Sequence, residues 1–350
     1  MKRLKLAILF GGNSPEYPVS LQSAYAIIKV LDGKRYEKIL IGITRDGRWF
    51  RYYGDIERIR DDNWYDNSAE CIPVSILPDP NIHGIIELKP DGYEITGLDA
   101  AFPVLHGRFG EDGTVQGLIE LAGIPLIGCD TLSSALCMDK NKAHKLVAQA
   151  GINIPKSIVL TEATQLQKYD KFIKKLGFPL FVKPLRAGSS FGITKVTNEE
   201  QLNLAISLAF SYDNRIIIEE HIEGFEVGCA IIGNDDLIIG EIDEIELTGG
   251  FFDYTEKYTL KSSRIHMPAR IDTDTANRIK RTAAVIYKTL GCRGFARVDM
   301  FLTPDKKIVF NEVNTIPGFT VNSRFPNMMK GIGLSYSDIL DMLIELGTKA

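Results

Sequence analysis

The chain has 350 residues, of which 45% are hydrophobic and 25% are charged, and its net charge at pH 7 is −4. These are ordinary values for a soluble globular protein with room for two or three domains, and no block of like charges indicates a nucleic-acid or membrane-surface partner. No window approaches the ~20 apolar residues of a membrane span, so we expect no transmembrane segment.

The N-terminus and the cysteines both indicate the cytoplasm. The apolar run after Met1 is too short for a signal peptide, and it ends in Gly-Gly with no small-residue cleavage site. The five cysteines show no CxxC or Cys/His spacing. This favours buried small hydrophobic residues in a reducing compartment over metal ligands or disulfides.

The first third of the chain alternates predicted strands with predicted helices. Apolar runs at 5–10, 36–44 and 98–107 predict strands, and the pattern at 21–31 predicts an amphipathic helix. Strands separated by helices indicate a parallel sheet covered by helices, so we assign residues 1–130 to an N-terminal α/β domain.

Two polar segments stand at the expected carboxyl ends of these strands, where ligands of such sheets bind. They are "GGNSPEYPVS", which contains Glu16, and "HGRFGEDG", which begins with His106. The two segments predict a small-ligand pocket. Taken alone, a histidine at a strand end is more often a hydrogen-bonded structural residue than a catalyst.

Residues 131–213 predict a central α+β domain. Helices are expected at 133–151 and 165–177, and the segment "FPLFVKPLRAGSSFGITKV" at 178–196 is typical of two antiparallel strands joined by a Gly/Ser-rich loop. Backbone N–H groups and hydroxyls of such a loop can bind a phosphate, and Lys183 would point at the same anion. The Walker A spacing is absent, and most glycine-rich hairpins are plain turns.

A segment without clear periodicity, 248–263, interrupts the strands of the last third of the chain. A loop of this length in a compact domain favours a functional lid, and it contains Lys257 and Tyr258. Before the lid, Glu219 directly follows a run of isoleucines, and Glu226 comes a little later. Their carboxylates could accept hydrogen bonds from an adenine amino group or ribose hydroxyls, or could belong to an ordinary sheet edge.

The third expected domain, 214–350, contains a predicted hairpin with an unusual polar face. Arg297 and Asp299 share one face of the first strand, and Glu312 and Asn314 share one face of the second. Oxygen ligands without His or Cys suit a hard cation such as Mg²⁺. The alternative is an exposed hairpin face that carries an ion pair.

The combination of these features describes an enzyme that uses ATP and magnesium on a small substrate. The phosphate loop, the lid lysine and the Mg²⁺-type ligands lie in the second and third domains. The pocket for a further ligand lies in the first.

The motifs, in this order, resemble those of the D-alanine–D-alanine ligase family of ATP-grasp enzymes. They are "GGNSPEYPVS", "HGRFGEDGTVQG", "MDKNKAHKL", "KPLRAGSSFGI", "DYTEKY", "ARVDMF" and "NEVNTIPGFT". The resemblance covers essentially the whole chain. It implies a three-domain ATP-grasp fold that holds ATP between the last two domains, and a cytoplasmic homodimer. It also implies ligation of D-alanine to a second D-amino or D-hydroxy acid for cell-wall precursors.

The resemblance also implies roles for individual residues. The residues implied to bind ATP are Lys140, Lys183 and Lys257 at the phosphates and Glu219 and Glu226 at the adenosine. Those implied to bind two Mg²⁺ ions, with Mn²⁺ as a substitute, are Asp299, Glu312 and Asn314. Those implied to bind the first D-alanine are Glu16 and His106. Those implied to stabilise the oxyanion are Arg297 and the Gly318 N–H. Those implied to orient substrate and lid are Glu16, Ser189 and Tyr258.

Two departures from the common family pattern concern the substrates. Tyr17-Pro18 stands where many members have His-Glu, and Arg324, after Ser323, stands where D-alanyl-D-alanine enzymes carry leucine. Arginine here, with an aromatic such as Phe252 in the lid, resembles the vancomycin-resistance ligases that use D-serine, above all the VanG type. An apolar pocket cannot strongly favour a hydroxyl, whereas a placed donor can, so we expect Arg324 to recognise D-serine.

Three alternatives stay open at this point. Arg324 could pair only with the second substrate's carboxylate or a lid residue, and the chain could be a housekeeping D-alanine–D-alanine ligase that carries arginine at this position. A D-lactate ligase fits less well, because that type differs across the lid and lacks the Lys-Tyr pair. A nucleotide-binding regulatory protein without chemistry is disfavoured, because the full set of lysines and Mg²⁺ ligands is present.

Overall fold

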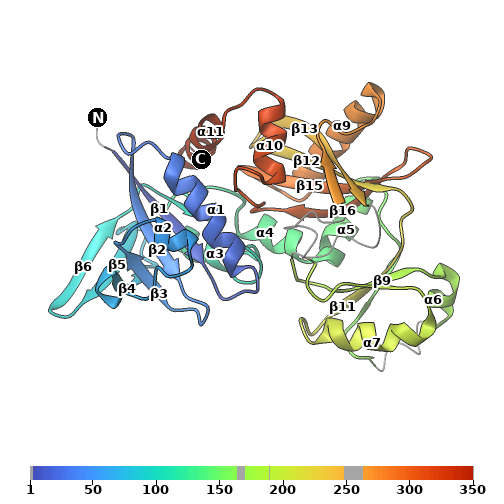
Figure 1. Ribbon diagram of the computed structural model, residues 1–350, viewed down its shortest axis with the longest axis horizontal. Helices are drawn as coiled ribbons and strands as arrows, with labels where there is room; N and C mark the ends of the chain where they lie inside the picture. The colour runs from blue at the N-terminus through green and yellow to red at the C-terminus, as the bar shows by residue number, and fades with distance from the viewer. Residues whose placement is uncertain (1–2, 164–169, 189, 248–262, 350) are drawn as a thin grey trace.

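The computed structural model describes residues 3–163, 170–188, 190–247 and 263–349. Within these ranges the chain folds around three β-sheets, whose strand orders are β6-β5-β4-β3-β2-β1-β7, β10-β9-β11-β8 and β14-β13-β12-β15-β16. The seven-stranded sheet lies on the left of Figure 1, the five-stranded sheet at the upper right and the four-stranded sheet at the lower right. This arrangement confirms the predicted combination of α/β and α+β units.

The seven-stranded sheet comes from residues 4–103 and is mixed. Its strands are β1 (Leu4–Gly11), β2 (Tyr36–Ile43), β3 (Trp49–Tyr52), β4 (Cys71–Ile76), β5 (Gly84–Lys89), β6 (Gly92–Gly97) and β7 (Ala100–Pro103). The strands β2, β1 and β7 run parallel, as predicted. The strands β3 to β6 extend the sheet in antiparallel fashion, which the sequence did not predict. They are short, and β6 is almost fully exposed, so they carry no strong hydrophobic period.

Helices of this unit fix the edge where its ligand segments meet. They are α1 (Tyr17–Val30), α2 (Glu57–Arg60), the 3₁₀ helix η1 (Ser68–Glu70) and α3 (Thr114–Leu121). The helix α1 buries an apolar face that includes Leu21, Ala24 and Ile27. Because β1 and β7 are parallel neighbours, the segments that follow them lie at the same edge of the sheet.

The four-stranded sheet belongs to the central unit. The elements of this unit are α4 (Thr131–Met138), α5 (Lys140–Gln149), β8 (Ser157–Leu160), α6 (Asp170–Leu176), β9 (Leu180–Pro184), β10 (Thr194–Val196), α7 (Glu199–Phe210) and β11 (Ile216–Glu220). The predicted antiparallel pair around the Gly/Ser loop is confirmed as β9 and β10. The expected boundary after residue 213 falls just before β11, which pairs with β8 and β9.

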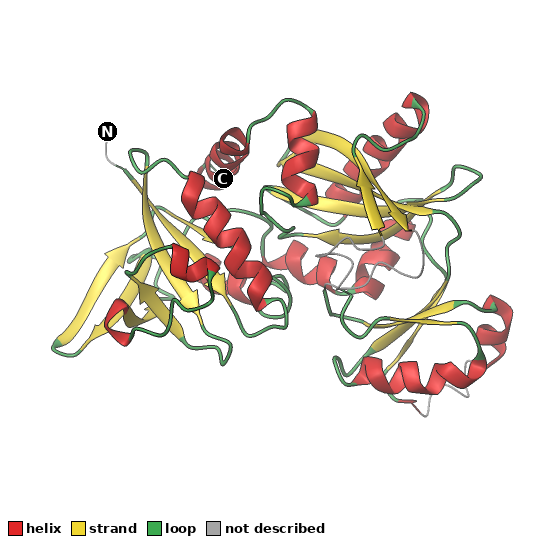
Figure 2. Ribbon diagram, viewed as in Figure 1, coloured by secondary structure: helices red, strands yellow, loops and turns green. Residues whose placement is uncertain are grey.

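The five-stranded sheet has helices on both faces (Figure 2). Its strands and the helices around it are β12 (Phe225–Gly233), β13 (Leu237–Leu247), β14 (Ser263–His266), α9 (Thr273–Thr289), β15 (Phe295–Leu302), β16 (Ile308–Asn314), α10 (Arg324–Gly331) and α11 (Tyr336–Thr348). Val227, Cys229 and Ile231 of β12 share a core with α9. Ala230 and Ile232 face the other way, into a core shared with α10.

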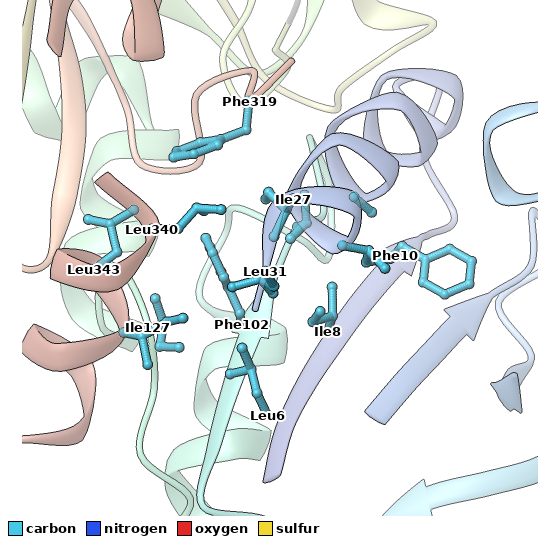
Figure 3. Close-up of a cluster of buried hydrophobic side chains, with 14 of the residues drawn as sticks. Leu6, Ile8, Phe10, Ile27, Leu31, Phe102, Ile127, Phe319, Leu340 and Leu343 are labelled. Atoms are coloured by element: carbon cyan, nitrogen blue, oxygen red, sulfur yellow. The ribbon is translucent and has the colours of Figure 1, made fainter. Parts of the chain in front are cut away.

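The C-terminal helix α11 returns to the N-terminal sheet. Leu340 and Leu343 of this helix pack in one core with Leu6, Ile8 and Phe102 (Figure 3). This core therefore joins the first and last segments of the chain.

The structure describes the state of the cysteines and the character of the helices. All five cysteines are free and buried. None of the helices in the described ranges is long and apolar enough to cross a bilayer.

Candidate active site

A cleft between the four-stranded and five-stranded sheets gathers many of the predicted residues. It holds about 1000 Å³ of space, the open solvent at its mouth included. The predicted site residues on its wall are Lys140, Lys183, Glu219, Glu226 and Glu312. They come from five elements, so the cleft exists only after the sheets have packed.

One end of the cleft is held by a buried cluster around Glu219. Lys183 of β9 places its Nζ 2.6 Å from Glu219 Oε2 on the neighbouring strand β11. His144 Nδ1 lies 3.6 Å from Glu219 Oε1, and its Nε2 is 2.9 Å from the Asn311 carbonyl. Burial raises the pKa of Glu219, but Lys183, His144 and Lys140 outweigh burial and hold it below its ordinary value. The carboxylate is therefore charged at neutral pH.

Lys140 connects the cleft to the Gly/Ser loop. The backbone of Asp139 is extended and its side chain accepts the Lys142 N–H, so α5 begins at Lys140. The helix that was predicted as continuous over 133–151 is therefore divided into α4 and α5. Lys140 Nζ donates to the Ala187 carbonyl at 2.9 Å and lies 3.5 Å from Glu312 Oε2. The positive charge thus stands between the loop and a predicted metal ligand, where phosphate oxygens would be neutralised.

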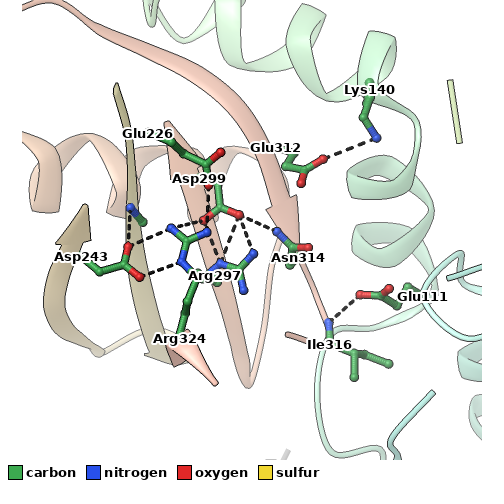
Figure 4. A network of polar contacts seen from close by, with 11 residues as sticks. Glu111, Lys140, Glu226, Asp243, Arg297, Asp299, Glu312, Asn314, Ile316 and Arg324 are labelled. Carbon is green, nitrogen blue, oxygen red and sulfur yellow. Dashed lines mark hydrogen bonds and ion pairs between the residues drawn. The ribbon is translucent and has the colours of Figure 1, made fainter. Parts of the chain in front are cut away.

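The predicted hairpin of β15 and β16 is confirmed, with Asp299 opposite Glu312 and Arg297 opposite Asn314. The Asp299 carboxylate accepts hydrogen bonds from Arg297 Nε at 2.8 Å and from Asn314 Nδ2 at 2.8 Å (Figure 4). Facing side chains on paired strands share one surface, so the residues predicted to bind metal lie together as expected.

Arg324 lies in a buried pocket of carboxylates from Asp243, Glu226 and Asp299, which we call the Arg324 seat. It is the first residue of α10, whereas the sequence had placed it in a loop. Its Nε and Nη2 donate to the two oxygens of Asp243 at 2.7 and 2.8 Å, and Nη1 donates to Glu226 Oε1 at 2.8 Å. Nη2 also lies 3.5 Å from Asp299 Oδ1. Burial lowers the pKa of Arg324, but these carboxylates outweigh burial and hold it above its ordinary value.

Sequence analysis missed two residues of this seat, Asp243 and Gly228. In register across β13, β12 and β15, Asp243, Gly228 and Asp299 lie side by side. A Cβ at Gly228 would lie 2.6 Å from Asp243 Oδ1 and would also collide with Arg324 Nη2. The signal that could have identified Asp243 was an acidic residue within a predicted strand. Its partner Arg324 lies 81 residues further along the chain, so no local pattern predicted the pair.

Glu16 and His106 meet at the ends of β1 and β7, as expected. Ser14 links them, because its Oγ donates to the His106 carbonyl at 2.7 Å and accepts the Glu16 N–H at 3.1 Å. Burial lowers the pKa of His106 to about 4, so the imidazole is neutral at pH 7. It can then exchange hydrogen bonds with a ligand but offers no positive charge to a carboxylate.

Two glycines allow Glu16 to sit between the N-terminal and central units. A Cβ at Gly107 would lie 2.5 Å from Glu16 Oε2, and a Cβ at Gly188 would lie 2.7 Å from it. Gly188 belongs to the Gly/Ser loop. The loop therefore touches the pocket of the first unit directly.

Glu111 is a third buried residue that sequence analysis missed. Its two oxygens accept the Gly107 N–H at 2.8 Å and the Ile316 N–H at 3.2 Å, which ties the loop after β7 to the loop after β16. Burial and the nearby Glu16 raise the pKa of Glu111 above its ordinary value. A smaller cavity connects this pocket to the β15–β16 hairpin that carries the predicted metal ligands (the ligand hairpin). Its lining includes Glu111, Lys140, Gly188, Glu312 and Asn314.

Gly318 and Ser323 lie in the loop that leads into α10. A Cβ at Gly318 would lie 3.1 Å from Ser323 Oγ, which also accepts the Thr320 N–H at 3.0 Å. The remaining predicted residues, Ser189, Phe252, Lys257 and Tyr258, lie outside the described residues.

The donor set of the hairpin fits a magnesium ion. Within the described ranges, no group of three His, Cys, Asp or Glu side chains is arranged as a metal site. The predicted set instead combines two carboxylates with the Asn314 amide, and Asp299 is engaged by arginine and amide donors. Oxygen-only donors match the preference of Mg²⁺, which takes further ligands from water and phosphate.

Comparison with known proteins identifies two matching families. Residues 5–129 match the family described as D-ala D-ala ligase N-terminus, and residues 146–345 match D-ala D-ala ligase C-terminus.

Individual relatives extend over nearly the full chain. The crystal structure of VanG D-Ala:D-Ser ligase from Enterococcus faecalis is 57% identical, with a TM-score of 0.91, and the match covers 99% of this chain and 100% of that one. The vancomycin B-type resistance protein VanB of Enterococcus faecalis is 46% identical over 99% of both chains. A D-alanine–D-alanine ligase of Caldicellulosiruptor bescii is 44% identical over 99% of this chain and 95% of its own.

Proposed function

Because this chain belongs to the D-alanine–D-alanine ligase family of ATP-dependent, ADP-forming enzymes, we propose that it joins D-alanine to D-serine. The product would enter peptidoglycan precursors with reduced affinity for vancomycin. We further propose that the enzyme works in the cytoplasm as a homodimer. The observation that carries the D-serine proposal is the buried Arg324, held beside the ligand hairpin by Asp243 and Glu226. The similarity to VanG D-Ala:D-Ser ligase supports it.

In this proposal the cleft binds ATP. Glu219 and Glu226 receive the adenine amino group and the ribose hydroxyls, and Lys140 and Lys183, with Lys257 of the lid, neutralise the phosphates. Asp299, Glu312 and Asn314 hold two Mg²⁺ ions, for which Mn²⁺ can substitute. When bound, these ions offset negative charge on the transferred phosphoryl group.

The N-terminal pocket binds the first D-alanine. Glu16 pairs with its ammonium group, and the neutral His106 adds a hydrogen bond. The carboxylate of D-alanine attacks the γ-phosphate, which releases ADP and gives D-alanyl phosphate. The small cavity between Glu111 and Asn314 is where the N-terminal pocket meets the phosphate site, so the two reactants can be brought together there.

The second substrate then attacks the carbonyl of D-alanyl phosphate with its amine, and inorganic phosphate leaves. Arg297 and the Gly318 N–H stabilise the negative charge on the carbonyl oxygen, a role typically worth about 3–4 kcal/mol per donor. Ser189 and Tyr258 orient the substrate and relay the amine's proton. Each of these assignments is part of the proposal.

Arg324 selects the second substrate by donating a hydrogen bond to the D-serine hydroxyl, directly or through water. A leucine at this position would leave an apolar wall, and such a wall discriminates poorly between side chains that differ by one hydroxyl. Ser323 and Phe252 complete this part of the pocket in the proposal.

The test measures phosphate release with D-alanine alone and with D-alanine plus equal D-serine or D-lactate, and identifies the products by mass. We expect D-alanyl-D-serine to dominate. Arg324→Leu should lower the D-serine to D-alanine selectivity by about tenfold or more. The control Arg58→Leu, which removes an arginine paired with Glu70 in the N-terminal unit, should leave selectivity unchanged.

Other outcomes discriminate among the alternatives. A wild-type enzyme that makes mainly D-alanyl-D-alanine would be a housekeeping ligase, and a depsipeptide product would indicate a D-lactate ligase. Both results would overturn the D-serine proposal. Phosphate release that does not depend on D-alanine would contradict the ligase chemistry itself.

A further inference from the structure

Glu226 lies where the nucleotide cleft meets Arg324. Its carboxylate lines the cleft, and the same carboxylate accepts the Arg324 Nη1–H at 2.8 Å. Its side chain is 18% exposed, whereas that of Arg324 is 8% exposed. We infer that Glu226 is a positioning residue for substrate selectivity, which transmits occupancy of the nucleotide cleft to Arg324. This inference rests on the proposed function.

Asp243 and Glu226 bind opposite sides of the Arg324 guanidinium group. Asp243 takes Nε and Nη2 and fixes one edge of the planar group. Glu226 fixes the remaining nitrogen, Nη1 (Figure 4). A rotation about the Asp243 edge would move Nη1 most, so Glu226 decides where that donor points.

A carboxylate can hold Arg324 and a nucleotide hydroxyl at the same time. Its two oxygens offer about four acceptor sites, so a ribose hydroxyl in the cleft need not displace the arginine. A bound nucleotide would restrict the Glu226 side chain and thereby restrict Nη1. The Arg324 guanidinium has little room to move, because it packs so closely against Gly228 that even a Cβ there would collide with it.

Coupling of this kind is reciprocal. If nucleotide in the cleft improves the affinity for the second substrate through Arg324, the second substrate must improve nucleotide binding by the same factor. Nucleotide affinity can therefore report on the coupling without any turnover.

Glu219 provides a matched control on the same cleft wall. Its carboxylate also lines the cleft, but it pairs with Lys183 at 2.6 Å and lies 3.6 Å from His144, whereas Arg324 pairs with Glu226 and Asp243. Glu219→Gln and Glu226→Gln make the same chemical change. They should weaken nucleotide binding alike and differ in their effect on selectivity.

The first experiment compares these two variants. The dissociation constant of ADP in the presence of Mg²⁺ is measured by calorimetry, and the ratio of D-alanyl-D-serine to D-alanyl-D-alanine is measured with both acceptors present. We expect both variants to bind ADP more weakly, and Glu226→Gln alone to lower the product ratio, by about fivefold or more. Equal product ratios in the two variants would overturn the inference.

The second experiment does not depend on the identity of the acceptor. The ADP dissociation constant is measured for Arg324→Leu and Arg324→Lys, each with Glu226 intact and with Glu226→Gln. We expect Arg324→Leu to weaken ADP binding about fivefold when Glu226 is intact and to have little effect in the Glu226→Gln background. The more conservative Arg324→Lys should show a smaller effect in the same pattern, and it covers the case in which the leucine variant fails to fold.

The two proposals can fail separately. Additive effects on ADP binding in this double-mutant cycle would overturn the coupling, whatever the enzyme produces. A wild-type product other than D-alanyl-D-serine would overturn the proposed function, and the ADP cycle would still decide whether Glu226 and Arg324 are coupled.

Discussion

Arg324 is placed against the usual preference for charge at helix ends. It is the first residue of α10, where the helix dipole disfavours a cation. Asp243 and Glu226 compensate by taking three of its hydrogen bonds, and Asp299 adds a third negative charge. A buried arginine with this many carboxylate partners is held in one orientation, which is what the proposed role in substrate selection requires.

The buried His106 makes a prediction about stability and pH. Its pKa is lowered to about 4 in the folded protein, below the ordinary 6.5, so the unfolded chain binds its proton first as the pH falls. The unfolding free energy should therefore decrease by about 2 kcal/mol through this group between pH 7 and pH 5. Urea denaturation of wild type and His106→Gln at both pH values isolates the contribution.

His106→Gln serves as the control, because it lacks only the titration of His106 and we expect its other groups to titrate as in wild type. We expect the wild type to lose more stability than His106→Gln on acidification. A variant whose unfolding free energy follows the wild-type pH dependence would show that His106 is protonated as easily in the folded protein as in the unfolded chain.

At the scale of single elements, the Gly/Ser loop joins the proposed phosphate site to the proposed D-alanine pocket. Gly188 of this loop faces Glu16, which precedes α1 in a different unit. Lys140 at the start of α5 donates to the Ala187 carbonyl in the same loop. The loop is therefore positioned by contacts from both sides of the active site.

Gly188→Ala should disturb the substrate pocket more than the fold. The new Cβ would lie 2.7 Å from Glu16 Oε2, and the flexible glutamate side chain would move aside. Because Glu16 is proposed to bind the D-alanine ammonium, we expect kcat/KM for D-alanine to fall by about 10–100-fold, mostly through KM. Steady-state kinetics and thermal unfolding together separate this effect from lost stability.

Gly33→Ala is the matched control, since no heavy atom lies within 4 Å of a Cβ there. It should leave both the kinetics and the unfolding temperature close to those of wild type. Unchanged D-alanine kinetics in Gly188→Ala would contradict the proposed role of Glu16 or its contact with the loop.

At the scale of the whole molecule, the C-terminal helix α11 joins the two ends of the chain. Leu343 is 1% exposed in the core that also contains Leu6 and Phe102. Leu343→Ala would leave a cavity there and should lower the unfolding free energy by about 2–5 kcal/mol. Chemical denaturation followed by the two tryptophans, Trp49 and Trp64 of the N-terminal unit, measures the change.

A leucine at the surface sets the scale for that loss. Leu204 of α7 is 76% exposed, so Leu204→Ala should change stability by no more than about 0.5 kcal/mol. If both leucine variants were equally stable, α11 would contribute little to the N-terminal core.

Local patterns in the sequence were enough to predict the fold class and several strand pairings. Parallel β2-β1-β7, the β9–β10 pair and the β15–β16 hairpin followed from hydrophobic period and turn residues, because these signals act over a few neighbouring positions. The same local rule predicted that Asp299, Glu312 and Asn314 share one surface of this hairpin, whereas the register that puts Asp299 opposite Glu312 came from the structure. The short strands β3 to β6 escaped prediction because they carry no strong alternation of buried and exposed residues, and β6 is almost fully exposed.

Tertiary structure alone decided how the site is assembled. Asp243 meets Arg324 across 81 residues, Glu111 ties Gly107 to Ile316, and Gly188 makes room for Glu16. No local pattern encodes these contacts, because each joins segments that become neighbours only when separate sheets pack. Burial then changes their charge states, as it does for His106, since desolvation is a property of the packed molecule and not of the residue.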